Sequence, residues 1–368
     1  MSKYYVHDLP DWPDIFYSHS QLVHSLASVR LAQGRLIGKL EALGFQLRSE
    51  ETLKNLSNDV LKSSEIEGMF LRPDQVRSSV ARKLGLPSAG LKKPDRNIDG
   101  FVEILLDATQ NYRKPLSIQR LHRWHTLLFP TGHSGLQKIE IGTWRKDKTG
   151  PMQVVSGRLD KPRVHFVAPA ARKIEREMKF FLQWFNATQE IDPIIKSGMA
   201  HFWFVTIHPY EDGNGRIARV IGDMQLARSE ENPHRFYSLS SRLAEKRKEY
   251  YVKLEKSQCG SLDLTDWLLW YTRILLEAIA ESEAGLKDTA RKARFWETHE
   301  MLAINARQRA MLNRLFDGFQ GKLTSSKWAA AAKCSQDTAI RDIQALIELR
   351  ILKQEKAGGR STNYVLIA

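Results

Sequence analysis

The chain has 368 residues, 42% of them hydrophobic, which is too long for one small core and predicts two or three folded units. Its two cysteines lie far apart and exclude a disulfide framework, and it lacks a signal-peptide core and any membrane-length apolar run, so we expect a cytoplasmic protein. The formal net charge of +14 favours an acidic partner such as a nucleotide or nucleic acid, with a generally basic surface as the alternative.

Two amphipathic helices are expected at the start of the chain. Apolar residues recur at helical spacing over 22–43 and over 53–60, and Gly44 and Gly68 are expected to end these helices. The second pattern places Glu67 on the face that its apolar residues assign to the interior. Burying an unpaired carboxylate is unfavourable, so Glu67 is expected either to reach water at a frayed helix end or to meet a cation.

Further helices are expected before residue 139, where the helical pattern ends. One opens at Pro73, and others begin at Asp99 and Ser117. The last of these carries His122 and His125, which are separated by two residues with no acid between them. This spacing does not fit a metalloprotease motif, and we interpret both histidines as ordinary helix residues.

A small β-hairpin is expected between residues 139 and 167. Strand-forming residues such as Val154 and Phe166 replace the helical pattern there, with a break at Gly157. A lone hairpin is only marginally stable in water, so this one must pack against the helical body. A helix over 169–188 follows, with apolar residues facing the core.

The run 208–219, His-Pro-Tyr-Glu-Asp-Gly-Asn-Gly-Arg-Ile-Ala-Arg, combines a base, an acid, two glycines and two arginines in one turn between two predicted helices. Gly213 and Gly215 let the backbone curl, so that successive N–H groups and the next helix N-terminus face one anion. Arg216 and Arg219, three residues apart, are able to reach the same ligand. The alternative is an ordinary helix-loop-helix turn with solvated charges.

Two helices are expected after this turn. One covers 241–256 and carries Tyr250 and Tyr251, and a long one starts at Thr265. The charged stretch 285–300 is either a linker or a continuation of that helix.

Residues 301–368 form a basic module, with eleven Lys or Arg against five Asp or Glu, a formal charge of +6. Two short helices capped by Thr324 and Ser335 precede a strand over 364–367, an order that resembles a winged helix-turn-helix. Ile340 is expected to face inward. DNA binding is the expected role of this module, with dimerisation or protein contacts as the alternative.

The run 208–219 resembles the signature of the Fic family, H-P-F-x-D-G-N-G-R-x-x-R. Tyr210 stands where that family usually has phenylalanine, a change that keeps the aromatic anchor. The resemblance covers roughly residues 53–251, and the rest of the N-terminal region rests on periodicity alone.

A second motif supports the same family. Ser63 to Gly68 resembles the S/T-x-x-x-E-G/N pattern that self-inhibited Fic proteins carry on a helix packed against the active site. The resemblance implies that Ser63 and Glu67 are inhibitory residues and that Glu67 pairs with Arg219, the second arginine of the signature.

The resemblance also implies the fold and its division. The expected fold is mainly α, a Fic helical core with a small β-hairpin flap, plus a C-terminal winged helix domain. The expected division is an N-terminal helical region over 1–115 with the inhibitory helix over 53–68, a Fic catalytic core over 116–284, a linker over 285–300 and a winged helix-turn-helix over 301–368.

A Fic protein of this kind is expected to be a protein adenylyltransferase, which moves AMP from ATP to a Ser, Thr or Tyr hydroxyl of a target protein. His208 is then the catalytic base, and Asp212 holds Mg²⁺ against the phosphates. The N–H groups from Gly213 to Gly215, with the Asn214 side chain, form the anion hole.

The remaining roles come from the same resemblance. Arg216 and Arg219 neutralise the departing pyrophosphate. Tyr251 either lines the adenine pocket or is a half-buried core residue. The flap over 152–156 clamps the target peptide by strand addition.

Three alternatives remain open at this point. One is removal of AMP from a modified target, with Glu67 orienting a water molecule, and another is transfer of a different phosphate-linked group. The third is a nucleotide-sensing transcription regulator, against which the intact His208 argues. The expected partners are ATP, a target protein, DNA and a second copy of the chain, without any membrane.

Overall fold

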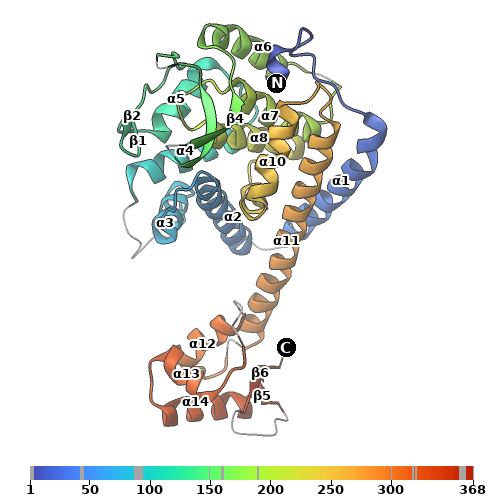
Figure 1. Cartoon of the computed structure of the whole chain (residues 1–368). Helices are drawn as coiled ribbons and strands as arrows, with labels where there is room; N and C mark the ends of the chain where they lie inside the picture. Colours follow the sequence, from blue (N-terminus) through green and yellow to red (C-terminus); the bar gives the residue numbers. More distant parts are fainter. Residues whose placement is uncertain are drawn as a thin grey trace. The chain divides into compact units, whose positions relative to one another are not determined.

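The computed structural model describes residues 4–41, 45–86, 94–148, 150–158, 161–188, 190–299, 301–316, 319, 321–355 and 362–367. It divides into two compact units, Met1–Glu283 and Ala284–Ala368 (Figure 1). Within the described ranges, no helix combines the length and the apolar character that a membrane span requires. Gly44, the predicted end of the first helix, lies outside the described residues.

The first unit is built almost entirely of helices, as predicted. In chain order they are η1 Val6–Asp8, α1 His19–Glu41, α2 Phe45–Ile66, α3 Pro73–Lys83, α4 Arg96–Gln110, α5 Ile118–Leu128, η2 Ala171–Lys173, α6 Ile174–Asn186, α7 Pro193–Ile207, α8 Asn214–Glu230, α9 Leu239–Glu245, α10 Arg247–Gln258 and α11 Thr265–Thr298.

Helix α2 buries the apolar stripe that the sequence predicts, including Leu53, Leu56 and Val60. It starts earlier than predicted, because the residues before Leu53 are mostly good helix formers. It ends as predicted at Gly68. This glycine has a φ of 79°, and the chain turns there. The N–H of Gly68 donates to Glu65 O at 2.9 Å and that of Met69 to Ser64 O at 3.0 Å, the Schellman pattern of a helix C-terminus.

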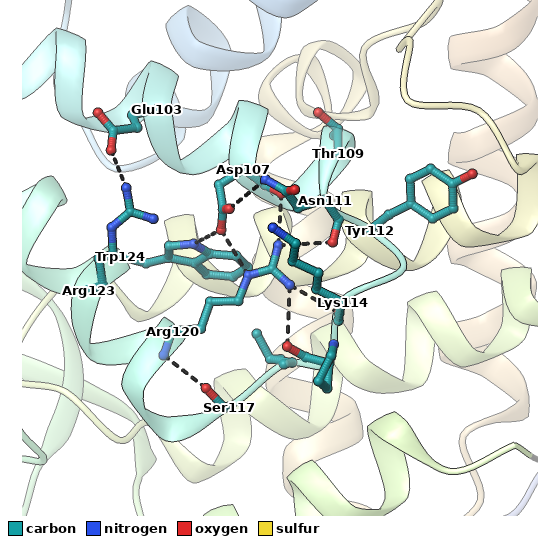
Figure 2. Close-up of polar contacts among 12 residues, drawn as sticks. Glu103, Asp107, Thr109, Asn111, Tyr112, Lys114, Ser117, Arg120, Arg123 and Trp124 are labelled. Atoms are coloured by element: carbon teal, nitrogen blue, oxygen red, sulfur yellow. Dashed lines mark hydrogen bonds and ion pairs between the residues drawn. The ribbon is translucent and has the colours of Figure 1, made fainter.

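Helices α4 and α5 are fixed to each other by one carboxylate, that of Asp107 (Figure 2). Its Oδ2 accepts hydrogen bonds from Arg120 Nε at 2.8 Å and Trp124 Nε1 at 2.7 Å, and its Oδ1 accepts one from Asn111 at 3.0 Å. Burial alone raises the pKa of Asp107, but these hydrogen bonds outweigh it and the pKa lies below its ordinary value. The orientation of α5 is therefore set by buried polar contacts as well as by apolar packing.

Two hairpins interrupt the helices. Strands β1 His133–Ser134 and β2 Gln137–Lys138 form a short one that the sequence does not predict. The predicted hairpin consists of β3 Gln153–Arg158 and β4 Lys161–Val167, paired antiparallel with a register shift after Val154. Phe166 is buried against Tyr5, with ring centroids 5.1 Å apart, so this hairpin does pack on the body of the unit.

The core of the first unit is α7 with α8. Every residue of α7 from Ile194 to Ile207 is buried, and Asp192 caps its N-terminus by accepting the N–H of Ile194 at 2.8 Å. Helix α8 packs along it and is itself buried over most of its length. The loop that joins them is therefore held by the most rigid part of the unit.

Two expectations for the following helices need correction. The single helix predicted over 241–256 is two helices, α9 and α10, because the chain leaves helical geometry at Lys246. The stretch 285–300 was either a linker or a continuing helix, and the structure has α11 continuing through it to Thr298.

The second unit contains the end of α11 followed by α12 Ala306–Phe316, α13 Ser325–Ala332, α14 Gln336–Glu348 and the antiparallel strands β5 Leu352–Gln354 and β6 Tyr364–Leu366. The predicted caps are present, since Thr324 and Ser335 each accept a backbone N–H at the start of their helices. Trp328, Ile343 and Leu346 are buried in its core. The inward placement of Ile340 is wrong: this side chain is 48% exposed.

Candidate active site

The loop between α7 and α8 is closed by Asn214. Its Oδ1 accepts the N–H of Tyr210 at 2.9 Å, and its Nδ2 donates to Tyr210 O at 2.8 Å. Both ends of the side-chain amide are thus used inside the loop. An amide nitrogen has two hydrogens and the bond to Tyr210 O uses one, so the contribution of the Asn214 side chain to an anion hole stays a prediction.

Two glycines of this loop are required by close approach. A Cβ on Gly213, which has a φ of 82°, would lie 2.8 Å from carbons of Leu128 and Phe129. A Cβ on Gly215 would lie 2.3 Å from Oε1 of Glu67. The carboxylate of Glu67 therefore rests directly against the backbone of the first turn of α8, where the helix dipole favours an anion.

His208 ends α7 in the left-handed conformation, with a φ of 51°. Its Nδ1 lies 3.2 Å from Val205 O, and because a carbonyl only accepts, Nδ1 carries the proton and Nε2 keeps its lone pair. Burial lowers the pKa of His208 to about 4, and the Arg145 guanidinium adds to that effect. The imidazole is therefore neutral and able to accept a proton at neutral pH.

Asp212 is the accessible acid of the loop, with a side chain that is 43% exposed. Its Oδ1 accepts the N–H of Gly213 at 2.6 Å, and its Oδ2 accepts a hydrogen bond from Ser134 on the unpredicted hairpin. Within the described part of the chain, no group of three or more His, Cys, Asp or Glu side chains is placed to hold a metal ion. A lone oriented carboxylate fits Mg²⁺, which binds to one or two carboxylates and completes its shell with phosphate oxygens and water.

Two arginines of α8, Arg216 and Arg219, have buried guanidinium groups. Arg216 stacks 4.9 Å from the centre of the Phe129 ring, and its buried Nε has no hydrogen-bond partner in the described chain. Arg219 is held by Ser63, whose Oγ accepts from Nε at 2.7 Å and whose carbonyl accepts from Nη2 at 2.9 Å. Cations buried to this degree require a negative group nearby.

Glu67 supplies that group for Arg219. Its Oε1 accepts from Nη2 of Arg219 at 2.7 Å, while the Glu67 side chain stays 30% exposed. Burial lowers the pKa of Arg219, but the Glu67 carboxylate outweighs it and the pKa is raised. Glu67 thus meets a cation, the second of the two outcomes open from the sequence.

Tyr251 touches the same helix end. Its hydroxyl donates to Ile66 O, the last residue of α2, at 3.2 Å, and its ring is 37% exposed. The role of Tyr251 in an adenine pocket stays a prediction.

Residues 115–226 match the model of the Fic/DOC family. This part of the chain is therefore similar to Fic domains. Residues 5–86, which include α1 and α2 with Glu67, match a domain of unknown function (DUF4172).

Named relatives and solved structures agree with this assignment. The chain is 32% identical over 114 residues to protein adenylyltransferase fic-1 of Caenorhabditis elegans, covering 30% of this chain and 21% of the relative. It is 24% identical over 336 residues to protein adenylyltransferase Fic of Drosophila melanogaster, covering 83% of this chain and 60% of the relative. The chain therefore spans less than two thirds of the length of either relative.

The fold is that of Fic proteins. The crystal structure of a Fic family protein from Desulfovibrio desulfuricans G20 matches with a TM-score of 0.52 at 20% identity, covering 96% of this chain and 98% of the other.

His122 and His125 lie in α5, as predicted, and both also contact the loop between α7 and α8. His125 Nδ1 accepts the N–H of Gly142 at 3.1 Å, so its Nε2 carries the proton and donates to Asp212 O at 3.2 Å. His122 Nδ1 lies 3.1 Å from the hydroxyl of Tyr210. The hydroxyl that distinguishes this loop from the family signature thus has a half-buried partner.

The contacts of Arg145 and Ser134 with this loop were not predicted from the sequence. Each contacts the loop from a segment more than 60 residues away, with sequence separations of 63 and 78. Neither belongs to a local pattern, so periodicity and motif spacing carry no signal for them.

Proposed function

We propose that the chain is a protein adenylyltransferase, which transfers AMP from ATP to a Ser, Thr or Tyr hydroxyl of a target protein. The observation that carries the proposal is the convergence of three features on one loop: the lone pair at Nε2 of His208, the N-terminus of α8, and the buried guanidinium groups of Arg216 and Arg219. The names of the similar proteins support the same activity.

In the proposed reaction, the target hydroxyl oxygen attacks the α-phosphorus of ATP. The new P–O bond joins AMP to the target, the bond from the α-phosphorus to the bridging oxygen breaks, and pyrophosphate leaves with that electron pair. The hydroxyl proton passes to Nε2 of His208, which is neutral beforehand. Backbone N–H groups at the start of α8 and the side chains of Arg216 and Arg219 stabilise the phosphate charge by position alone.

A magnesium ion fits this site in one place. Asp212 is the residue that would hold it, and the ion would neutralise negative charge on the phosphates of ATP. Ser134 and the N–H of Gly213 orient that carboxylate in the protein itself.

We further propose that Glu67 inhibits the transfer. Its carboxylate occupies the N-terminal turn of α8 and engages Arg219, so it competes with the phosphate of ATP for the same donors. Removal of AMP from a modified target, with a water molecule on Glu67, is the alternative reaction of the same site.

The experiment that tests the proposal is His208→Ala, assayed with ATP, Mg²⁺ and intact-mass detection of a gain of AMP. The variant should lose transfer and keep ATP binding, because the base acts in the chemical step while other groups hold the phosphates. Substantial residual transfer would remove His208 from this role. Loss of mass from a pre-modified target, without any gain from ATP, would favour AMP removal.

We propose DNA binding as a separate function of the second unit. The observation that favours it is the surface of α14, where Ile340, Arg341 and Gln344 are exposed on one face of a helix held by a tight turn after α13. Arginine and glutamine are the side chains that pair with base edges, and an exposed apolar residue suits the methyl group of thymine. Dimerisation through the same unit is the alternative.

A further inference from the structure

The buried guanidinium of Arg145 is the strongest polar contact to the loop that the proposed mechanism leaves unused. Its side chain is 1% exposed. Nε donates to His208 O at 2.8 Å, Nη2 donates to Pro169 O at 2.6 Å, and Nη1 is paired with Asp147. The backbone N–H of Arg145 donates to Pro209 O at 3.0 Å.

Two of these contacts hold the two peptide groups that follow an unusual backbone conformation. His208 is a non-glycine residue with a φ of 51° and a ψ of 58°, a conformation that costs an L-residue about 1–2 kcal/mol and persists only when its surroundings impose it. Arg145 binds the carbonyls of His208 and of the next residue, so it restrains the peptide that follows this conformation. A cation at the C-terminus of α7 also complements the helix dipole.

The left-handed conformation sets where the imidazole points. It brings Nδ1 of His208 back to Val205 O and leaves Nε2 free. We propose that Arg145 is a positioning residue for His208, holding the backbone that fixes the tautomer and direction of this base. The inference rests on the proposed function, in which His208 is that base.

Lysine cannot replace Arg145 in this position. The planar guanidinium reaches two carbonyls and one carboxylate in three directions, whereas an ammonium group is a single point charge on a flexible stem. The carboxylate is itself anchored, since Asp147 Oδ2 accepts the N–H of Ala171 at 2.7 Å. The base of the β3–β4 hairpin and the catalytic loop therefore meet at one side chain.

The test compares Arg145→Lys with Arg123→Lys, both in a Glu67→Gly background that removes inhibition. Arg123 is a suitable control because its side chain is 57% exposed on α5 and pairs with Glu103. Arg145→Lys should lower kcat about a hundredfold, as misplacing a catalytic group by about 1 Å does, with the Kd for ATP within about twofold of the parent. Arg123→Lys should change neither quantity.

A spectroscopic measurement distinguishes a loss of His208 positioning from a general loss of structure. In ¹⁵N spectra of the imidazole groups, with the His208 signals assigned from His208→Ala, the parent should show the Nδ1–H tautomer and Arg145→Lys should lose it. If Arg145→Lys does not fold, Asp147→Asn replaces it and should lower kcat about tenfold, since it removes one charged partner of the guanidinium.

The outcomes distinguish the two proposals. An unchanged kcat with an unchanged tautomer in folded Arg145→Lys would overturn the role of Arg145, as would an Nε2–H tautomer in the parent. No transfer by the Glu67→Gly parent would instead contradict the proposed function, and the tautomer comparison would still decide the role of Arg145.

Discussion

Glu67 has two properties that make it suited to inhibition. It follows the last residue of α2, so its backbone is held by the Schellman turn, and its side chain reaches Arg219 while remaining partly exposed to water. Breaking a hydrogen-bonded pair in which the cation is buried, as Arg219 is, typically costs a few kcal/mol. Holding about 99% of the molecules blocked needs only about 2.7 kcal/mol, so one ion pair is sufficient.

We predict that Glu67→Gly raises the rate of AMP transfer by up to about a hundredfold, because Arg219 and the N-terminal turn of α8 then become available to ATP. The rate is measured at saturating ATP with labelled nucleotide. Glu65→Gly is the matched control, since Glu65 lies two residues away, is 39% exposed and pairs with Lys62 at 2.7 Å within α2. Equal rates for the parent and folded Glu67→Gly would show that this helix does not regulate the site.

The signature residues were predictable one by one, but, Glu67 apart, the residues that orient them were not. The proposed roles of His208, Asp212 and the two arginines follow from a twelve-residue pattern, and the pairing of Glu67 with Arg219, which the structure contains, follows from a second pattern. The side chains that orient these residues act across sequence separations of 63 to 87 residues. These orienting side chains can be read in the sequence, but the sequence does not indicate which distant backbone groups they contact.

At the scale of elements, α2 is attached to the rest of the first unit by a buried polar cluster as well as by its apolar stripe. Asp59 is 2% exposed, and its Oδ1 accepts a hydrogen bond from Ser238 at 2.5 Å. Nearby, Arg235 contacts Asp223 and Glu230, each at 3.2 Å. Two carboxylates thus share the Arg235 guanidinium, and Asp59 lies close enough for the charges of Asp223 and Arg235 to affect it. Burial, followed by the charge of Asp223, raises the pKa of Asp59 well above its ordinary value.

This cluster predicts a specific pH dependence of stability. Because the pKa of Asp59 is higher in the folded than in the unfolded protein, the folded protein binds more protons once the pH exceeds about 3.8, the ordinary value. The stability contributed by Asp59 is therefore present at low pH and is lost as the pH rises toward the folded pKa. Asp59→Asn removes this loss, because the amide does not ionise.

We expect Asp59→Asn to raise the Tm at pH 8 by about 2–4 °C, which corresponds to roughly 1 kcal/mol, and to raise it less at pH 5. Thermal unfolding followed by circular dichroism at the two pH values measures the difference. Asp11→Asn is the control, since Asp11 is exposed. A lower Tm for Asp59→Asn at pH 8 would mean that the ionised carboxylate of Asp59 stabilises α2 in its site.

Elements were predicted well where periodicity and capping residues agree. Helices α7 and α8, and the caps Thr324 and Ser335, occur where the sequence places them. The β1–β2 hairpin was missed because strands of two residues have no alternation to detect. Ile340 was misplaced because the buried face of α14 is instead formed by Ala339, Ile343 and Leu346, and periodicity alone leaves the width of an apolar face undefined.

At the scale of the whole molecule, the two matched family models lie in the first unit. The two matched models cover residues 5–86 and 115–226, both in the first unit. The role of residues 284–368 must therefore be argued from their own surface. That surface includes α14, whose exposed residues Gln336, Ile340 and Gln344 recur every fourth position along one face.

The charge distribution along α14 predicts which of its residues contact DNA. Asp337 near the start and Glu348 at the end are exposed and repel phosphates, which leaves Ile340, Arg341 and Gln344 in the middle of the face to meet base edges. Exposed Lys333, in the turn before α14, is placed for phosphate contact. These two groups of residues should respond differently to substitution, because base contacts carry specificity and phosphate contacts carry salt dependence.

We predict that the full-length chain retards duplex DNA at low salt and loses affinity steeply as salt increases. Arg341→Ala should cost about 1–3 kcal/mol on a selected site and relax its specificity, whereas Lys333→Ala should weaken all sequences and reduce the salt slope by about one. His208→Ala serves as the control and should bind DNA like the parent, since His208 lies in the other unit. If the full-length protein retards neither a random duplex pool nor its own upstream sequence at low salt, DNA is not its partner. Sedimentation of the same protein would then test the remaining role of the second unit, pairing with a second copy of the chain.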